Sequence, residues 1–315
     1  MPAITVVVPT RDREALLAQA LESIRAQTLA DWEAIVVDDG SSDATRELIE
    51  RLAREDTRIR AVEREAGKRG ANPCRNAGFL ASRAPLVTFL DDDDLFSPEC
   101  LEERVRAADR HPEVDFLVFP HRHFDREPGD SDSWRPAETR RDPLDRYLAV
   151  DIPWQTAGVT WRRESFQRLG PWREELLCWQ DWELLVRALA RGFRWRAESG
   201  PSFFHRRWSS SSGQSVSVRL DPARARSVAR AIHLGTAELV EHRRLTRERR
   251  RLVLRLCDSA VRPLLAHGLR GEAEAFLAAM GELIPGRLSG LILGSAGRWL
   301  DRRGSRWVLR LLKRT

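Results

Sequence analysis

Short apolar segments alternate with amphipathic ones along the first 120 residues of the chain. Five apolar segments rich in β-branched residues have the pattern of buried strands. They are residues 4–8, 34–37, 59–62, 86–90 and 114–119. Between them apolar residues recur at helical spacing, as Leu17, Leu21 and Ile24 do. This alternation predicts an α/β domain with an open, mostly parallel sheet flanked by helices.

Three of the predicted strands end in polar residues. Thr10 and Arg11 follow the first strand, Asp38 and Asp39 follow the second, and four aspartates at residues 91–94 follow the fourth. Ligands of open α/β sheets bind beyond the carboxyl ends of the strands. We therefore expect these three clusters to form one binding site.

The four aspartates at residues 91–94 place four carboxylates at one strand end. Like charges that close raise one another's pKa unless a cation lies between them. Mg²⁺ or Mn²⁺ prefers oxygen ligands and keeps coordination positions open for phosphate. The pattern predicts a divalent-cation site, and the alternative is an acidic turn that faces water.

Beyond residue 120 the alternation stops. Residues 120–150 are polar and contain several prolines, which predicts a loop or an insertion. His121 and His123 alternate there and are candidate metal ligands. Because no third ligand lies near them in the sequence, we favour surface or loop histidines. Residues 201–208 predict a short strand that contains His205.

A serine-rich stretch at residues 209–213 predicts the end of the first domain. We accordingly expect a domain over residues 1–213 and a basic helical region over residues 214–315. Helical patterns within that region cover residues 231–241, 252–265, 271–280 and 306–312.

Charge is distributed unevenly between these two parts. The chain has a net charge of +6, but residues 216–315 contain 21 Lys and Arg against 9 Asp and Glu. A basic helical tail, with arginines from Arg243 to Arg251 and with Trp299 and Trp307 near its end, predicts docking on an anionic membrane surface or on a lipid-linked acceptor. The alternative is a helical cap whose basic face is solvated.

Composition narrows the class of protein. A hydrophobic content of 42% is enough for a substantial core, and the four cysteines lack the paired spacing of a zinc site or a disulfide framework. The first residues lack the pattern of a signal peptide, and no run approaches the ~18 apolar residues of a membrane helix. We expect a cytoplasmic protein.

Motifs of other nucleotide-binding classes are absent from the sequence. Neither G-x-G-x-x-G nor G-x-x-x-x-G-K-[ST] follows the first strand, which excludes a dinucleotide fold and a P-loop. A nucleotidyltransferase remains an alternative, although the first strand lacks the phosphate loop usual in that class. A recognition motif for nucleic acid is also missing, so we expect no nucleic-acid partner.

Five motifs, taken in order, resemble those of glycosyltransferase family 2, inverting enzymes with the GT-A fold. The resemblance covers residues 4–213. Its motifs are Val8-Pro9-Thr10-Arg11-Asp12-Arg13, Val37-Asp38-Asp39-Gly40-Ser41-Ser42-Asp43, Cys74-Arg75-Asn76-Ala77-Gly78, the segment from Phe89 to Asp94, and Gln180-Asp181-Trp182-Glu183-Leu184.

The resemblance implies a role for each matching residue. It implies that Asp181 is the general base and that Asp93 holds the metal, with His205 in a segment that closes over the diphosphate and adds a ligand. The residues implied to bind the nucleotide sugar are Pro9, Thr10, Arg11, Arg13, Asp39, Arg75, Asp91 and Asp92. Asp39 would accept a hydrogen bond from the base, most commonly uracil.

Two residues depart from the family pattern, and one role has an alternative. Gln180 stands where relatives commonly have Glu, and Cys74 stands where Ala is usual. Because Asp92 occupies the variable place of the D-x-D motif, the metal assignment is uncertain by one position. Asp181 starts a predicted helix, so its alternative role is to cap that helix.

The activity that the resemblance implies is metal-dependent transfer of a hexosyl group from a nucleotide-diphosphate sugar to a hydroxyl. A UDP-sugar is the first candidate donor, and the acceptor would be a saccharide or a lipid-linked or protein-linked group. Polysaccharide, glycolipid or glycoconjugate synthesis would be its setting, at the inner face of the membrane if the tail docks there. The alternative from another class is a module that binds nucleotide and metal without catalysis.

Overall fold

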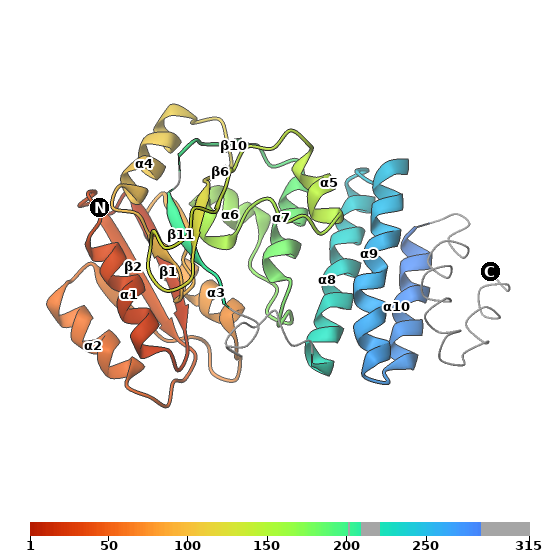
Figure 1. The fold of residues 1–315 in the computed structure, drawn as a ribbon, viewed down its shortest axis with the longest axis horizontal. Helices are drawn as coiled ribbons and strands as arrows, with labels where there is room; N and C mark the ends of the chain where they lie inside the picture. The colour runs from red at the N-terminus through yellow and green to blue at the C-terminus, as the bar shows by residue number, and fades with distance from the viewer. Residues whose placement is uncertain (201, 209–220, 285–315) are drawn as a thin grey trace. The chain divides into compact units, whose positions relative to one another are not determined.

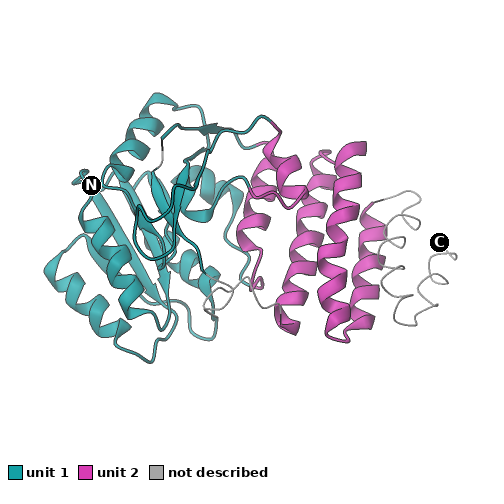
Figure 2. Cartoon of the chain, in the orientation of Figure 1, with its two compact units in different colours: residues 1–140, 153–174, 193–215 teal, residues 141–152, 175–192, 216–315 magenta. Residues whose placement is uncertain are grey.

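A computed structural model of the chain describes residues 1–200, 202–208 and 221–284. The chain divides into two compact units, coloured separately in Figure 2. The first consists of residues 1–140, 153–174 and 193–215, and the second of residues 141–152, 175–192 and 216–315. Two segments that precede the expected boundary at residue 213 therefore group with the C-terminal helices.

A seven-stranded sheet forms the centre of the first unit, with the strand order β10-β6-β9-β4-β1-β2-β3 (Figure 1). Its strands are β1 (Ile4–Thr10), β2 (Trp32–Asp38), β3 (Ile59–Val62), β4 (Leu86–Phe89), β6 (Phe116–Val118), β9 (Val159–Arg162) and β10 (Trp195–Ala197). β9 runs antiparallel to β4 and β6, and the other neighbouring pairs are parallel. The expected open, mostly parallel sheet is thus confirmed.

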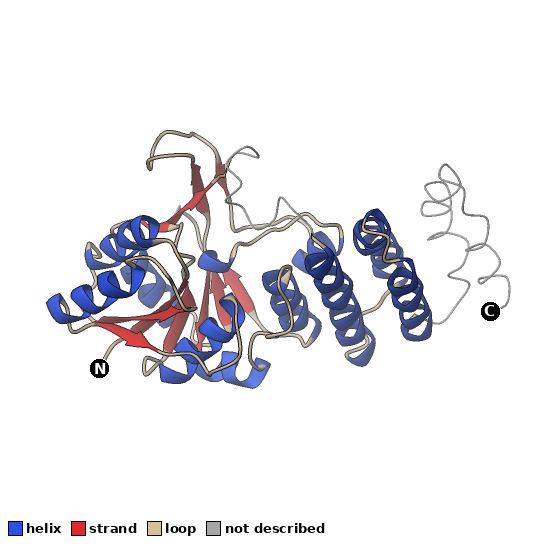
Figure 3. Cartoon of the chain, turned by 90° about the horizontal axis from the view of Figure 1, so that it is seen from below, coloured by secondary structure: helices blue, strands red, loops and turns tan. Residues whose placement is uncertain are grey.

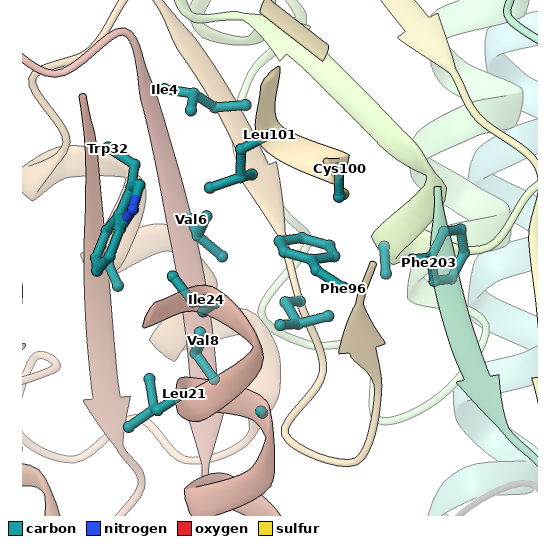
Figure 4. Close-up of a cluster of buried hydrophobic side chains, with 14 of the residues drawn as sticks. Ile4, Val6, Val8, Leu21, Ile24, Trp32, Phe96, Cys100, Leu101 and Phe203 are labelled. Atoms are coloured by element: carbon teal, nitrogen blue, oxygen red, sulfur yellow. The ribbon is translucent and has the colours of Figure 1, made fainter. Parts of the chain in front are cut away.

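Both faces of this sheet are covered, which is why its central strands β1, β2 and β4 are mostly apolar and buried along almost their whole length. Figure 4 shows Val6 and Val8 of β1 directed toward Leu21 and Ile24 of α1 (Glu14–Arg25). On the other face Val37 of β2 packs in a cluster with Cys74 of α3 (Ala71–Ala81). The remaining helices of this unit are α2 (Thr45–Glu55), α4 (Cys100–Arg110), α6 (Arg163–Leu169) and the short 3₁₀ helix η1 (Thr156–Gly158).

A second, four-stranded sheet has the order β5-β11-β7-β8. Its strands are β5 (Leu95–Phe96), β7 (His121–Phe124), β8 (Trp134–Arg135) and β11 (Phe203–Arg206). β11 runs antiparallel to β5, which directly follows the four aspartates, and parallel to β7. The prediction of a loop over residues 120–150 is wrong at β7 and β8, because strands this short carry too little periodicity to be recognised.

The described part of the second unit is helical. The described strands, red in Figure 3, belong to the first unit. Its helices are α5 (Pro143–Leu148), α7 (Gln180–Ala190), α8 (Pro222–Glu241), α9 (Arg247–Ala266) and α10 (Arg270–Leu283). α8 begins as a helix should, with Asp221 accepting the N–H of Arg224 and Pro222 in the first turn. The three helices predicted between residues 231 and 280 are confirmed as parts of α8, α9 and α10.

The basic tail is described in part. The predicted helix at residues 306–312, Trp299 and Trp307 lie outside the described residues. Among the arginines at residues 243–251, Arg249 is paired with Asp142 and Asp145 of the same unit, at 2.8 and 2.6 Å. Among the helices that the structure describes, none has both the length and the apolar character needed to cross a membrane.

Candidate functional site

The carboxyl ends of β1 and β4 meet at one edge of the main sheet, because the two strands are parallel neighbours. The hydroxyl of Thr10, at the end of β1, donates a hydrogen bond of 2.8 Å to Oδ2 of Asp92. A backbone hydrogen bond from Asp94 to the carbonyl of Asp91, 3.0 Å long, closes the four aspartates into a turn. We call residues 91–94 the acidic turn.

The four side chains of the acidic turn have two different environments. The side chains of Asp91 and Asp93 are 38% and 18% exposed, whereas those of Asp92 and Asp94 are 7% and 3% exposed. The accessible pair stands at the two Asp positions that the resemblance assigns to a D-x-D motif. Asp91 and Asp93 are therefore the carboxylates that can reach a ligand, and the other two serve the turn itself.

Arg75 of α3 holds Asp91 in place. Its Nη2 lies 2.6 Å from Oδ1 of Asp91, and its Nη1 donates to Oδ1 of Asn72 at 3.1 Å. The guanidinium lies over the ring of Trp172, 4.7 Å from the ring centroid, and Arg75 is 3% exposed. The predicted contact of Arg75 with a nucleotide stays a prediction, and in this structure the residue orients Asp91.

Asp92 and Asp93 share one cation. Nη1 of Arg13 lies 2.8 Å from Oδ1 of Asp92 and 3.2 Å from Oδ2 of Asp93. The indole N–H of Trp208 also donates to Oδ2 of Asp93, at 2.8 Å. Burial raises the pKa of Asp92 to about 6, although Arg13 and Thr10 act in the opposite direction. Trp208 is a contact that no motif in the sequence indicated.

Asp94 anchors β11 to the acidic turn. It accepts the backbone N–H of Arg206 at 3.0 Å, and Nδ1 of His205 lies 3.2 Å from its carboxylate. Burial opposes the charged imidazole of His205, but Asp94 outweighs it and raises the pKa of His205 to about 9. The same carboxylate is almost fully buried, and burial raises its pKa. His205 is thus brought to the site through Asp94.

Three histidines gather on one face of the small sheet. The ring of His121 lies 4.8 Å from that of His123 and 5.5 Å from that of His205, between centroids. His121 is 2% exposed, so the prediction of a surface or loop histidine is wrong for it. Burial, with His205 and His123 nearby, lowers the pKa of His121 to about 3, which leaves its ring neutral. The parallel pairing of β7 with β11 brings the third histidine close.

Asp39 lies at the end of β2, where the base of a nucleotide is expected. It is 7% exposed, and its two oxygens receive Nε of Arg64 at 2.5 Å and the backbone N–H of Gly70 at 2.9 Å. Nη1 of Arg11 lies 3.8 Å from the same carboxylate. Gly70 has a φ of 110°, which favours glycine at this position. Pro9 lies beside Val37 in the β1–β2 pair, so it shares this edge of the sheet.

The donor set of the acidic turn fits a hard divalent cation. Asp91 and Asp93 offer carboxylate oxygens, and Mg²⁺ is usually held by one or two carboxylates together with phosphates and water. In the described residues, three potential ligand atoms lie within 4.8 Å of one another at Glu238, Glu241 and His242. Glu238 is bound by Arg191 at 2.8 Å, as Asp91 and Asp93 are bound by arginines, so it is the position of the acidic turn at the strand ends that makes it the better candidate.

Asp181 lies in the second unit, near the start of α7. The residue at the N-cap is Trp179, whose φ is 62°, and it makes no side-chain cap. Asp181 is inside the first turn, and its Oδ1 accepts the N–H of Trp182 at 2.9 Å. Trp182 itself is a core residue, 2% exposed, with its indole N–H on the carbonyl of Tyr147. The carboxylate of Asp181 therefore has a local bond without being the N-cap.

The sequence of this chain matches a known protein family. The model of "Glycosyl transferase family 2" matches residues 5–170, more than half of the chain. The chain belongs to glycosyltransferase family 2. The matched part contains the acidic turn, Asp39 and Arg75, whereas Asp181 and His205 lie beyond it.

This family 2 chain has curated relatives with named reactions. It is 31% identical over 228 residues to validoxylamine A glucosyltransferase of Streptomyces hygroscopicus subsp. limoneus, covering 61% of this chain and 49% of that one. It is 43% identical over 94 residues to GalNAc(5)-diNAcBac-PP-undecaprenol beta-1,3-glucosyltransferase of Campylobacter jejuni, covering 30% of each. The chain spans less than two thirds of the length of these relatives.

Solved structures establish the fold of the family 2 chain as GT-A. S. aureus TarS in complex with UDP-GlcNAc matches with a TM-score of 0.64 at 18% identity, covering 100% of this chain and 92% of that one. The mannosyltransferase PcManGT of Pyrobaculum calidifontis, in complex with GDP-Man and Mn²⁺, matches with a TM-score of 0.55 at 18% identity, covering 99% and 83%.

Proposed function

We propose that this family 2 chain is an inverting hexosyltransferase that uses a nucleotide-diphosphate sugar. The observation that carries the proposal is the accessible pair Asp91 and Asp93 at the end of β4, beside Thr10 at the end of β1. UDP-sugar is the first candidate donor, because TarS was solved with UDP-GlcNAc and has a similar fold. The acceptor is a hydroxyl on a saccharide, a lipid-linked or a protein-linked group.

The edge formed by β1 and β2 is the proposed nucleotide site. Asp39 accepts a hydrogen bond from the base, and Pro9, Thr10 and Arg11 line the pocket. Arg64 and Gly70 each donate one hydrogen bond to Asp39. A carboxylate has about four acceptor positions, so Asp39 can accept an N–H of the base while it keeps both partners.

The acidic turn is the proposed site of Mg²⁺ or Mn²⁺. Such an ion, when bound, supplies Lewis-acid stabilisation of the departing diphosphate. Asp93 is the proposed carboxylate ligand, Asp91 reaches the ribose or the metal's waters, and Asp92 stays inside the turn. His205 can offer its Nε2 as a second metal ligand only as a neutral ring, so a bound ion would have to displace the proton that Asp94 favours on the imidazole. The Mn²⁺ complex of PcManGT supports this role.

Asp181 is the proposed general base. An inverting displacement needs one carboxylate to take the proton of the acceptor hydroxyl as the oxygen attacks. Gln180, next to it, cannot take a proton, so the pair that relatives commonly have is reduced to one acid here. The half-buried position of Asp181 keeps the carboxylate reachable by an acceptor.

The basic tail is proposed to dock on an anionic membrane or on a lipid-linked acceptor. The undecaprenol-linked substrate in the name of the Campylobacter relative supports a membrane setting. A helical cap with a solvated basic face is the alternative. Arg249 is paired with Asp142 and Asp145 of its own unit, so this arginine is less available to an anionic surface. Co-sedimentation with anionic vesicles at low and high salt separates the two, since a cap alone gives no binding at low salt.

Calorimetry of UDP binding tests the donor and metal sites together. The wild type and Asp93→Asn are each titrated with and without Mn²⁺, and Asp109→Asn, an exposed aspartate of α4, is the control. We expect Mn²⁺ to tighten UDP binding in the wild type and in the control, and not in Asp93→Asn. Equal affinity in all conditions would remove the metal role. Thermal stabilisation by UDP-, GDP- and dTDP-sugars with Mn²⁺ then identifies the donor.

A further inference from the structure

Arg13 reaches the acidic turn from a rigid position. Its backbone carbonyl accepts the N–H groups of Leu16 and Leu17 at 3.1 and 2.9 Å, in the first turn of α1. Its own N–H points to the hydroxyl of Thr45, at 3.3 Å. The guanidinium therefore meets Asp92 and Asp93 because the backbone before α1 aims it there.

Three cationic side chains face the four carboxylates of the acidic turn. Asp91 is paired with Arg75, and Asp94 with His205. Arg13 is the cation whose ion pairs with Asp92 and Asp93 the structure records, through a single nitrogen at 2.8 and 3.2 Å. One guanidinium nitrogen thus stands between two carboxylates, which is the place a divalent cation also seeks.

Burial makes this contact matter. Asp92 is buried, and a buried carboxylate without a counter-charge is costly. Asp93 is more accessible and holds a second donor, the indole N–H of Trp208, on the oxygen that faces Arg13. Arg13 can give up Asp93 and keep Asp92, because the shorter bond is the one to the buried partner.

We propose that Arg13 is the resident counter-cation of the acidic turn: it holds Asp93 while no metal is bound and yields Asp93 to a divalent cation. The proposal rests on the proposed metal role of Asp93. Arg13 then lowers the affinity of the turn for metal alone, since the ion must displace a positive charge.

Nucleotide changes this balance. A diphosphate gives Arg13 an alternative anion, and charge-assisted bonds between Arg and phosphate are strong. Arg13 released from Asp93 can turn to the diphosphate, so nucleotide and metal favour each other's binding. This coupling is reciprocal, and part of it belongs to Arg13.

Titration with Mn²⁺ alone tests the proposal without any turnover. Free Mn²⁺ is followed by electron paramagnetic resonance for the wild type and Arg13→Gln, whose amide can still reach the turn but carries no charge. We expect Arg13→Gln to bind Mn²⁺ tighter by about fivefold or more, on the scale of one charge in a partly exposed site. The factor by which UDP tightens Mn²⁺ binding should be smaller in Arg13→Gln than in the wild type.

Two further variants separate charge from shape. Arg51→Gln removes an exposed arginine of α2 whose ion pair is with Glu55, outside the proposed binding sites, and it should bind Mn²⁺ as the wild type does. Arg13→Lys keeps the positive charge without the planar guanidinium, and its affinity for Mn²⁺ should lie between those of the wild type and Arg13→Gln. It provides a test if Arg13→Gln fails to fold.

Two results would contradict the role proposed for Arg13. Equal or weaker Mn²⁺ binding by Arg13→Gln, or by Arg13→Lys if only that variant folds, would overturn the role of Arg13 and leave the metal site standing. Absence of Mn²⁺ binding by the wild type, with and without UDP, would overturn both this inference and the metal role proposed for Asp93.

Discussion

Glu183 and Arg187 form an ion pair within α7, with Nε of Arg187 3.1 Å from Oε1 of Glu183. Their side chains are 0% and 2% exposed, respectively. The second acidic residue of the Gln180–Leu184 motif is thereby committed to the interior of its unit. Breaking such a pair leaves an uncompensated buried charge, so a catalytic role for Glu183 would conflict with its packing. Asp181 is left as the acid of this motif that can act on a substrate.

Asp181→Asn should therefore abolish transfer while the fold survives. The amide oxygen can still accept the N–H of Trp182, so stability should change little. An amide cannot take the proton of the acceptor, and turnover should fall by about two orders of magnitude or more. Initial rates with a donor identified by thermal stabilisation, together with the melting temperature and UDP affinity, check this.

A matched control is Glu175→Gln, which removes an exposed acid a few residues before the motif. It should keep full activity. An Asp181→Asn enzyme that turns over near the wild-type rate would remove Asp181 from the mechanism and leave the base unassigned.

Gly78→Ala should destabilise the first unit. A Cβ at Gly78 in α3 would overlap the side chain of Val7 in β1, because the helix packs directly on that strand. Overpacking of a core typically costs about 1–3 kcal/mol in the free energy of unfolding. Chemical denaturation measures the loss. Gly271→Ala is the control, since its Cβ meets nothing within 4 Å. A Gly78→Ala protein as stable as this control would show that α3 can move away from β1 at little cost.

Asp115→Asn should destabilise the protein at neutral pH more than in acid. Burial opposes the charged carboxylate of Asp115, but the backbone N–H of Arg194, the hydroxyl of Ser165 and the guanidinium of Arg168 lower its pKa below the ordinary 3.8. A lowered pKa stabilises the folded state above pH ~4, and this contribution is lost as pH falls through the folded value.

Denaturation curves at pH 7 and pH 3 check this prediction. The difference between wild type and Asp115→Asn should be about 1–3 kcal/mol at pH 7, on the scale of hydrogen bonds to a charged group, and smaller at pH 3. The exposed Asp109→Asn is the control for the substitution itself and should be about as stable as the wild type at pH 7. The linkage would be refuted by a difference between wild type and Asp115→Asn that is the same at both pH values.

The sequence by itself determined the strands and helices around the acidic turn. Local patterns carry that information, because a buried parallel strand is apolar throughout and an amphipathic helix repeats its apolar face every 3.6 residues. The same local logic placed Asp38, Asp39 and the acidic turn at strand ends. The GT-A fold followed once these strand ends were recognised in order.

Tertiary structure alone decided how the four aspartates divide their tasks. The resemblance assigned the metal to Asp93 but left that assignment uncertain by one position, whereas the turn after β4 directs Asp91 and Asp93 outward and Asp92 and Asp94 inward. The contact of Arg13 with Asp92 spans 79 positions in the chain, and that of His205 with Asp94 spans 111. No periodicity links residues so far apart.

Strand pairing decided the rest. His121 was expected at the surface because its partners are absent from its own segment, and it is buried because β7 pairs with β11. Residues 141–152 and 175–192 group with the C-terminal helices because they contact segments that lie far away in the chain. Which segments come together depends on burying apolar faces across the whole chain, and that is a sum over distant contacts which no local pattern contains.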